Sequence, residues 1–569
     1  MVRVTGSHLI GKALKLEGVN NIFYLAGDHI LPALDVMADQ GFRFIDTRHE
    51  AAAVHMADAY ARITGQIGVS MYTTPGFANA IPGLTNARHS ESPLLSISGS
   101  ADLSEAGRGS MQEIDQVGMA STVVKESLTV YDARRIPDTI ARAVRIAFSG
   151  RRGPVHLTIP IDIQDQEIDE NEVVFYNPDE YRASESMNAS PALVQQAVAL
   201  MREAKRPFVI AGDAAGYAQS GEVLQKFAET TRLPVLTEGQ ARGMVADGHP
   251  YGFGFFERGL NRAATRVRDA DLVILLGRKQ DYTIGFARPP HIAADARIIQ
   301  IDPSAAEIGR NRGVNVGIVG DVTSVLEQIT QEAARYTWQD LPWLQDLRAS
   351  RAAQAEWADS LAVAETPMHA MYVHQTVASM LRPDDVLTFD GGDYCHFGRS
   401  LLPSNMAKRW FYVSTLGMLG TSLPYALAAQ VAYPDSRVLN FTGDGAFGFN
   451  GMEFDTAVRH KLNVVTVMGN DSAWGIDRQI QLGLYGKTVG TELLQTRYDQ
   501  VVQGLGGHGE FVEKPEEVKP AIERAFASGK PALVNIAIQG AISPRAEAAI
   551  ARRKEAMGQG RNGGNRQQP

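Results

Sequence analysis

Asp444 and Asp471 are the residues whose type and spacing most directly suggest chemistry. Asp444 follows the apolar segment SRVLNFT between Gly443 and Gly445, and Asp471 follows LNVVTVMGN, 27 residues later. If both segments are parallel strands, the two carboxylates lie at the sheet edge where ligands bind. The glycines let the backbone approach a ligand, and the helix expected over residues 449–460 directs its N-terminus there, which suits a phosphate. The pattern predicts Mg²⁺ held by two carboxylates and diphosphate oxygens.

A third acidic residue, Glu50, is expected at another strand-to-helix junction. It follows His49 after the segment FRFIDTR and precedes the helical segment AAAVHMADAYARITG. Taken alone, Glu50 is better interpreted as a helix-N-terminal carboxylate that interacts with the helix dipole. Together with the diphosphate motif, it is better interpreted as a carboxyl group that exchanges or holds a proton.

The elements that must position these residues form three α/β blocks. Strand-like segments alternate with helical ones over residues 1–164, 191–330 and 367–539, and this alternation predicts parallel sheets. The middle block, with RPFVIAG, LPVLTE, DLVILLG and ARIIQID, has a Rossmann-like pattern. The first and third blocks look like variations on one theme. The expected fold class is α/β with three parallel-sheet domains and a basic C-terminal tail. We place the domains at 1–185, 190–335 and 365–542, followed by the tail at 543–569.

Composition narrows the class of protein. The chain has 569 residues, a net charge of -9 and one cysteine, Cys395. A negative charge gives no general attraction to nucleic acid or to anionic membranes, and we expect neither as a partner. A single cysteine excludes an intrachain disulfide and fits a reducing compartment. The N-terminal segment lacks the apolar core of a signal peptide, so we expect a cytoplasmic protein.

Over nearly its whole length, the chain resembles the thiamine-diphosphate-dependent enzymes. The resemblance rests on the GDG and NDSAWG motifs, on Glu50 after "RH", on TTPGFAN (73–79) and on TLGMLG (415–420). It implies that Glu50 bonds the pyrimidine ring of the cofactor and activates its thiazolium carbon. It also implies that Asp444, Asp471 and the carbonyl of Ala473 bind Mg²⁺. The family usually has Asn where this chain has Asp471, so an additional negative charge lies near the diphosphate.

The same resemblance assigns a set of cofactor-binding residues. Leu419 falls where a bulky side chain bends the cofactor, although simple core packing would explain it equally well. The implied cofactor-binding residues are Pro75, Asn79, Leu419, Gly443, Asp444, Gly445, Ala446, Asp471, Ala473, Trp474 and Gly475.

Within the family, the domain order is similar to that of acetolactate synthase, benzaldehyde lyase, oxalyl-CoA decarboxylase and 2-hydroxyacyl-CoA lyase. The segments GDAAGYAQSGEVLQKFAETTRLPV and GQARGMVADGHP resemble the two CoA enzymes. Their central domain holds an ADP moiety, so ADP is also expected here, as a bound activator or CoA mimic. Lys279 departs from the pattern, because those enzymes usually carry Arg there. The implied nucleotide- or CoA-binding residues are Arg151, Gly212, Tyr217, Arg278, Lys279, Asp302, Asp321 and Arg545.

The leading hypothesis is a lyase that cleaves a 2-hydroxyacyl-CoA, for example 2-hydroxyisobutyryl-CoA, to formyl-CoA and an aldehyde or ketone. The reverse reaction is an acyloin-type condensation. The resemblance nominates Glu492 as the base, and His29 and Gln112 as polar groups near the thiazolium ring. A surface glutamate and a structural histidine are the corresponding alternatives. His29 falls on the active-site histidine of benzaldehyde lyase.

Several alternatives stay open. They are a benzaldehyde-lyase-like hydroxyketone lyase, a decarboxylase similar to oxalyl-CoA decarboxylase or acetolactate synthase, and a non-catalytic nucleotide-binding protein. A dinucleotide oxidoreductase would need a GxGxxG turn, which NIFYLAGDHI does not supply. The resemblance further implies a homodimer or homotetramer with active sites between subunits. The tail from about Arg545 has six basic and two acidic residues, and we expect a mobile lid that orders over CoA.

Overall fold

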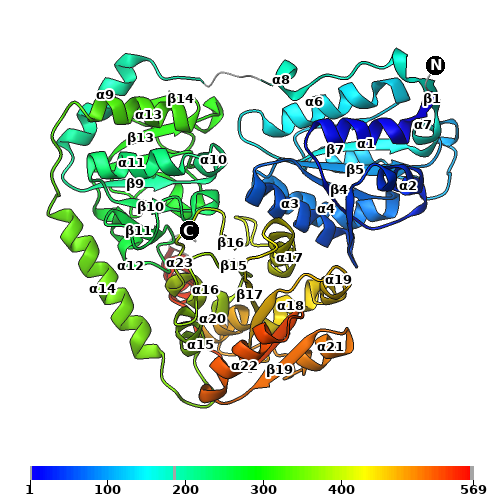
Figure 1. Ribbon diagram of the computed structural model, residues 1–569. Coiled ribbons are helices and arrows are strands. Elements are labelled where there is room, and N and C mark those ends of the chain that lie inside the picture. Colours follow the sequence, from blue (N-terminus) through cyan, green and yellow to red (C-terminus); the bar gives the residue numbers. More distant parts are fainter. Residues whose placement is uncertain (1–2, 183–186, 564–569) are drawn as a thin grey trace, which may run out of the picture.

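The computed structural model describes residues 3–182 and 187–563, which fold into three α/β domains. Each domain is built on a six-stranded sheet whose neighbouring strands run parallel. The domains lie at the corners of a triangle, and α14 (Trp343–Leu361) runs along the side that joins the central domain to the third (Figure 1). The expected fold class is confirmed.

The first and third sheets share one strand order. The orders are β3-β2-β4-β5-β7-β6 and β16-β15-β17-β18-β20-β19, which become identical when strands are numbered within each domain. The two blocks are therefore variations on one topology, as expected. The strands of the first sheet are β2 (Asn21–Tyr24), β3 (Arg43–Asp46), β4 (Gly68–Tyr72), β5 (Leu94–Ser100), β6 (Ser127–Thr129) and β7 (Val155–Pro160). Those of the third are β15 (Val386–Phe389), β16 (Trp410–Tyr412), β17 (Val438–Gly443), β18 (Val465–Asn470), β19 (His508–Val512) and β20 (Ala532–Ala537).

The central sheet has the doubly wound order expected of a Rossmann-like domain. Its order is β11-β10-β9-β12-β13-β14, in which the chain reverses direction across the sheet between β9 and β12. The strands are β9 (Pro207–Ala211), β10 (Val235–Thr237), β11 (Gly252–Phe255), β12 (Leu272–Leu276), β13 (Arg297–Asp302) and β14 (Val316–Val319). A separate antiparallel pair joins β1 (Arg3–Thr5) to β8 (Glu167–Asp169).

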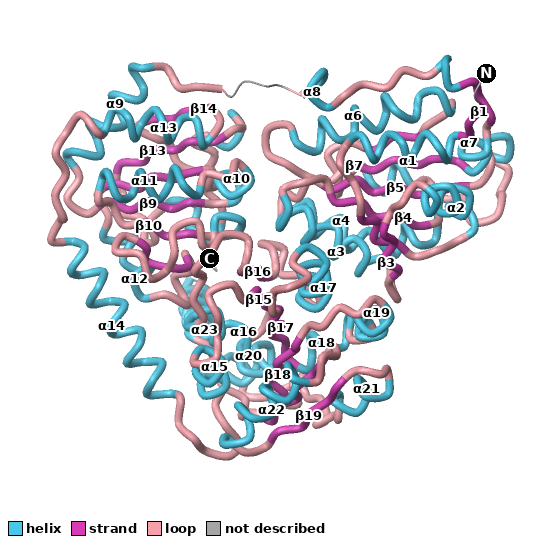
Figure 2. Tube along the Cα trace, in the orientation of Figure 1, coloured by secondary structure: helices cyan, strands magenta, loops and turns pink. Residues whose placement is uncertain are grey.

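Helices cover both faces of the sheets (Figure 2). None of the helices in the described ranges is both long and apolar enough to cross a membrane. The first domain has α1 (Gly6–Leu16), α2 (Leu31–Asp39), α3 (Glu50–Thr64), α4 (Thr74–His89), α5 (Gln116–Ala120), α6 (Ile136–Phe148), α7 (Ile161–Asp165) and α8 (Pro178–Tyr181). The central domain has α9 (Pro191–Glu203), α10 (Asp213–Tyr217), α11 (Gly221–Thr231), α12 (Arg262–Thr265) and α13 (Val322–Ala333). The third has α15 (Ala370–Ala378), α16 (Asp393–Leu401), α17 (Ser422–Ala432), α18 (Asp444–Asn450), α19 (Glu453–Arg459), α20 (Gly475–Tyr485), α21 (Tyr498–Gly504) and α22 (Pro515–Ala527).

Helix α3 joins the first and third domains through one hydrophobic core. Its Ala-rich sequence is apolar around most of its circumference, which is typical of a helix buried on all sides. One side packs on the first sheet and α4, and the other on α17 of the third domain. The Tyr425 hydroxyl on α17 donates to Asp58 (2.8 Å) and accepts from Asn86 (2.6 Å). The two domains therefore share buried surface beside Glu50.

The C-terminal segment differs from the expected irregular, mobile tail. Residues 544–563 form α23 (Pro544–Gly563), which packs on α20. The Ser543 hydroxyl accepts from the Ala546 amide at the helix start (3.3 Å), and Ile550 is buried against Gly483. The Ala-rich sequence explains the helix, because alanine has the highest helix propensity. The end of the predicted lid, residues 564–569, lies outside the described residues.

Candidate active site

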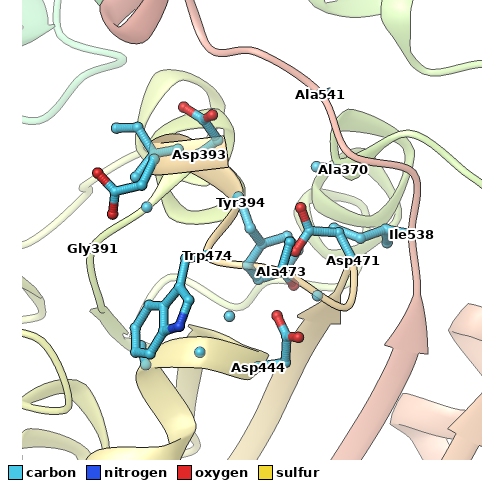
Figure 3. Close-up of a pocket in the computed structure, with 18 of the residues that line it drawn as sticks. Ala370, Gly391, Asp393, Tyr394, Asp444, Asp471, Ala473, Trp474, Ile538 and Ala541 are labelled. Atoms are coloured by element: carbon cyan, nitrogen blue, oxygen red, sulfur yellow. The ribbon is translucent and has the colours of Figure 1, made fainter. Parts of the chain in front are cut away.

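A cleft opens at the carboxyl ends of β17 and β18, where the sequence predicts a metal site (Figure 3). Strand β17 ends at Gly443 and α18 begins at Asp444, whereas Asp471 directly follows β18. The two strands are hydrogen-bonded neighbours. The predicted cofactor residues that line it are Leu419, Gly443, Asp444, Gly445, Ala446, Asp471, Ala473, Trp474 and Gly475.

Close packing requires glycine at several places in this lining, two of which lie against side chains that the sequence assigns to the cofactor. A Cβ on Gly445 would lie 2.8 Å from the Trp474 ring, and one on Gly391 would lie 2.5 Å from Leu419 Cδ2. A side chain at either position would displace a residue that shapes the cleft. Gly445 of the GDG motif is therefore explained by close packing, whereas a Cβ on Gly443 would lie no closer than 3.9 Å to another atom, which leaves room for a ligand as its explanation.

Asp444 and Asp471 fit a divalent cation. Asp444 is 2% exposed, and its Oδ2 has no hydrogen-bond partner among the described residues. Burial, and secondarily the charge of Asp471, raises the pKa of Asp444 well above its usual range. Within residues 3–182 and 187–563, no three His, Cys, Asp or Glu side chains are grouped to hold a metal ion. A cation here would thus need further oxygens, which a backbone carbonyl and a diphosphate can supply.

Sequence reasoning missed a third carboxylate in the cleft, Asp393. It begins α16, and both of its side-chain oxygens are buried without a hydrogen-bond partner among the residues described. Burial raises the pKa of Asp393 to about 6. The lining also includes Asp477 but no Lys, Arg or His side chain. The signal available in the sequence was DGGD, a second Gly-rich turn with an aspartate after a predicted strand.

We expect Asp393→Asn to tighten binding of thiamine diphosphate with Mg²⁺ by about tenfold, or ~1.4 kcal/mol. The substitution removes a negative charge that repels a diphosphate and places an amide donor beside it. Trp474 lines the cleft, so tryptophan fluorescence can follow the titration, with calorimetry as a second readout. Asp477→Asn is the matched control, because it makes the same charge change at an exposed position on the rim. Unchanged or weaker binding by Asp393→Asn would contradict the charge argument.

Glu50 lies in the first domain, in a position that suits a proton-holding carboxyl. It begins α3 and is 7% exposed, and Asn79 Nδ2 donates to its Oε2 (3.1 Å). A Cβ on Gly76 would lie 2.7 Å from Glu50 Oε1, so glycine gives this carboxyl its room. Pro75 and Asn79 lie on one exposed face of α4, one turn apart. The predicted pyrimidine-side residues are thus brought together.

The turn before Glu50 is held by a residue of the third domain that sequence reasoning also missed. The buried carboxylate of Glu453 on α19 accepts hydrogen bonds from the amides of Arg48 (3.0 Å) and His49 (3.1 Å). His49 in turn caps α3, because its side chain accepts from the Ala51 amide. Glu453 follows a Gly-Met pair in the expected helix, and nothing in that pattern indicates a contact more than 400 residues away.

His29 and Gln112 occupy different surroundings in the same domain. His29 is buried, and its Nδ1 lies 3.0 Å from the hydroxyl of Thr73, the first residue of the TTPGFAN turn. Burial lowers the pKa of His29. Gln112 lies in the loop before α5 with a φ of 62°, and it lines a separate cavity with Gln116. Only His29 is therefore placed directly beside the TTPGFAN turn.

Glu492, nominated as a base, does not line the cleft. Its backbone forms a bridge with Ala473, but its carboxylate is 55% exposed and ion-paired with Arg478 (2.9 Å). An exposed ion pair holds a side chain only weakly. The structure therefore places Glu492 beside the cleft without directing its carboxylate into it.

The two halves of the predicted site lie apart in one chain. Glu50, Pro75, Asn79 and His29 are all absent from the lining of the cleft that contains Asp444. A cofactor held by both halves would need the two regions to come from different subunits or a large movement of the chain.

A basic cavity of about 600 Å³ lies between the first and central domains. Arg151 and Lys279 line it, and both are ion-paired with the buried carboxylate of Glu91. Lys125 donates to the carbonyl oxygens of Ser149 (2.6 Å) and Arg151 (3.0 Å), which holds the loop that carries the arginines. The further cations in the lining are Arg88, Arg152 and Arg310. The cavity is therefore suited to an anionic ligand.

Most other predicted nucleotide-binding residues do not line this cavity but contact other residues of the protein. Asp302 is fully buried and hydrogen-bonded to Arg151 (3.2 Å), so it is occupied by a protein partner and not free for a ribose. Arg278 is ion-paired with Glu238 and Asp281, and a Cβ on Gly212 would meet its side chain. The Tyr217 hydroxyl donates to the Ser90 carbonyl (2.9 Å), Asp321 caps α13, and Arg545 is ion-paired with Glu257 (3.1 Å).

Comparisons with known proteins match three separate parts of the chain. Residues 4–119 match the N-terminal TPP binding domain of thiamine pyrophosphate enzymes, residues 194–329 the central domain, and residues 390–536 the C-terminal TPP binding domain. A probable acetolactate synthase of Mycobacterium bovis is 32% identical over 538 residues, or 93% of this chain and 94% of that protein. The 2-hydroxyacyl-CoA lyase 2 of Homo sapiens is 30% identical (94% and 90%), and the 2-hydroxyacyl-CoA lyase of Arabidopsis thaliana is 29% identical (94% and 96%).

Proposed function

Because this chain belongs to the family of thiamine pyrophosphate enzymes, we propose that it is a carbon–carbon lyase acting on a 2-hydroxyacyl-CoA. The products would be formyl-CoA and an aldehyde or ketone, with the condensation as the reverse reaction. Thiamine diphosphate would bind with Mg²⁺ at Asp444, Asp471 and the Ala473 carbonyl, in a cytoplasmic homodimer or homotetramer.

Different residues of the chain would have different roles in this reaction. When bound, thiamine diphosphate supplies a carbon nucleophile and accepts the electron pair released from the broken carbon–carbon bond. Glu50 holds a proton at the pyrimidine ring, and Asn79 fixes the orientation of its carboxyl. Asp444 and Asp471 would hold the diphosphate through the cation, and Leu419 lines the same cleft. His29, which lies beside the TTPGFAN turn, would exchange a proton with a substrate hydroxyl.

The basic cavity is the observation that most favours a CoA ester. Among its described side chains, Arg88 and Arg152 form no ion pair with a carboxylate, and Arg152 Nη1 is buried without a hydrogen-bond partner. A CoA diphosphate and 3′-phosphate would supply the missing acceptors, because guanidinium forks match phosphate oxygens. ADP, as an activator or CoA mimic, would satisfy the same groups.

An acetolactate-synthase-like reaction is the second candidate, supported by the relative with that name at 32% identity. The substrate of that reaction is a free 2-oxo acid, which carries no phosphate for the cations of the basic cavity to bind. The same purified enzyme can be tested with 2-hydroxyisobutyryl-CoA, with free 2-hydroxyisobutyrate and with pyruvate, with thiamine diphosphate and Mg²⁺ present. Formyl-CoA and acetone formed from the CoA ester support the lyase, whereas acetolactate from pyruvate alone overturns it.

We expect Lys279→Met to raise KM for the CoA ester about tenfold, or ~1.4 kcal/mol, while thiamine diphosphate affinity is kept. Glu91 retains Arg151 as its partner, so the change removes a cation from the cavity without leaving an unpaired buried carboxylate. Lys226→Met, exposed on α11, is the matched control.

The same assay tests whether helix α23 covers the site. If it does, a chain ending at Ser543 should show a higher KM for the ester. Unchanged KM in both variants would favour a substrate without CoA.

A further inference from the structure

A chain of buried polar groups leads from the interior of the first sheet to His29. From β5 to β7, Ser96 Oγ lies 2.9 Å from His156 Nδ1, and His156 Nε2 lies 3.1 Å from Thr158 Oγ1. The Thr158 hydroxyl donates to Gln116 Oε1 (3.3 Å), and Gln116 Nε2 donates to the Thr74 hydroxyl (3.1 Å). Tyr72 bonds Ser96 at the far end. All of these side chains are buried.

The donor and the acceptor in each of these hydrogen bonds can be assigned, because some of the groups can only donate or only accept. The carbonyl of Gly99 can only accept, and Gln116 Nε2 lies 3.0 Å from it. The amide nitrogen of Gln116 is therefore on the Thr74 side, and its oxygen faces Thr158. Because the Thr158 hydroxyl donates to that oxygen, it accepts from His156 Nε2–H. Burial lowers the pKa of His156 to about 3, so this ring is neutral and its Nδ1 accepts from Ser96.

Thr74 links this chain of hydrogen bonds to His29, and its donor and acceptor roles are fixed by the same reasoning. Its hydroxyl accepts from Gln116 and lies 3.1 Å from the Gly99 carbonyl, to which it donates. The single hydroxyl proton of Thr74 is therefore used, and the oxygen can face His29 Nδ1 (3.4 Å) only as an acceptor. The Thr73 hydroxyl lies 3.0 Å from the same nitrogen and is also able to accept. Both neighbours are satisfied when Nδ1 carries the proton.

We propose that Thr74 is a positioning residue that holds His29 in the tautomer with the proton on Nδ1 and the lone pair on Nε2. His29 Nε2 forms no hydrogen bond with any described residue, and burial keeps the ring neutral. His29 is then prepared to accept a proton. If the proposed function holds, the proton of the substrate hydroxyl moves to Nε2, the O–H electron pair forms the new C=O bond, and the broken carbon–carbon pair stays with the acyl carbon. Return of that proton to the acyl carbon balances the reaction.

Histidine ¹⁵N NMR tests the tautomer without any substrate. In wild-type protein, the His29 resonances, assigned by their loss in His29→Gln, should show a protonated Nδ1 and an unprotonated Nε2. Thr74→Val keeps the shape of the side chain but removes the hydroxyl that can only accept from His29 Nδ1. Thr73 is then free to donate to Nδ1, and the ring proton should shift to Nε2. Thr73→Val is the matched control and should keep the wild-type tautomer, because Thr74 can still only accept.

Kinetics provide a readout that simple loss of packing would not give. Thr74→Val should lower kcat for the CoA ester at least tenfold with KM unchanged, whereas Thr73→Val should have a smaller effect. A wild-type His29 with its proton on Nε2, or a Thr74→Val protein with an unchanged tautomer, would overturn the proposal. If the tautomer is as expected but no CoA ester is cleaved, the proposed function fails and the positioning role stands.

Discussion

Replacement of Glu50 by Gln is expected to lower turnover by about 10²–10⁴-fold, the usual contribution of an acid–base group, while cofactor binding is kept. The amide has nearly the same size and keeps a side-chain oxygen as an acceptor for Asn79 Nδ2. It cannot exchange a proton with the pyrimidine ring, however. The diphosphate and Mg²⁺ would be held elsewhere, in the cleft of Asp444 and Asp471, so affinity should change little.

Hydrogen–deuterium exchange at the thiazolium carbon, followed by NMR after rapid quenching, measures this activation directly. Calorimetry measures cofactor affinity in the same variant. Glu523→Gln on the exposed face of α22 is a matched carboxylate-to-amide control and should behave like wild type. Wild-type exchange in the Glu50→Gln protein would remove Glu50 from the mechanism.

Mixing two inactive variants, Glu50→Gln and Asp444→Ala, is expected to restore activity to about a quarter of the wild-type value. With random exchange in a symmetric dimer, half of the dimers are hybrids, and each hybrid has one site with both functional residues. The expectation rests on the separation of Glu50 from the Asp444 cleft within one chain. Activity should appear only after subunit exchange, which a tagged and an untagged chain can verify by affinity purification.

A second mixture controls for nonspecific stabilisation. Chains that carry both substitutions, mixed with an equal amount of wild-type chains, should lower total activity, because every hybrid site lacks one functional residue. Verified hybrids of the single variants without recovery would mean that each site is completed within one chain, through movement of the first domain against the third.

The parts of the structure that depend on local pattern could be predicted from the sequence. The three parallel sheets follow from alternating apolar and helical segments, and the placement of Asp444 and Asp471 follows from strand ends and glycine turns. The role of Glu50 could be predicted only in combination with the diphosphate motif at Gly443–Gly445. Each of these inferences uses only residues close in sequence or the general geometry of parallel sheets.

The parts that depend on long-range contacts could not be predicted. Glu453 reaches the turn before Glu50 from another domain, and Asp302 is occupied by Arg151 although it ends a strand as expected for a ribose ligand. The exposed ion pair of Glu492 and the tautomer of His29 are set by neighbours distant in sequence. Helix α23 was not predicted, because the basic residues and glycines of this segment are typical of a mobile tail, although the first half of the helix is rich in alanine.

The core that α3 shares with α17 has a consequence for folding. Buried residues of the first and third domains belong to one continuous hydrophobic cluster, whereas the central domain has two cores of its own and adds Phe255 and Leu260 to a core of the third domain. Cooperative units of a protein follow its buried contacts more closely than its chain order. The first and third domains should therefore lose structure as one unit, although the whole central domain separates them in the sequence. In biosynthesis, the Glu50 side of the site would reach its final form only after the last domain has been made.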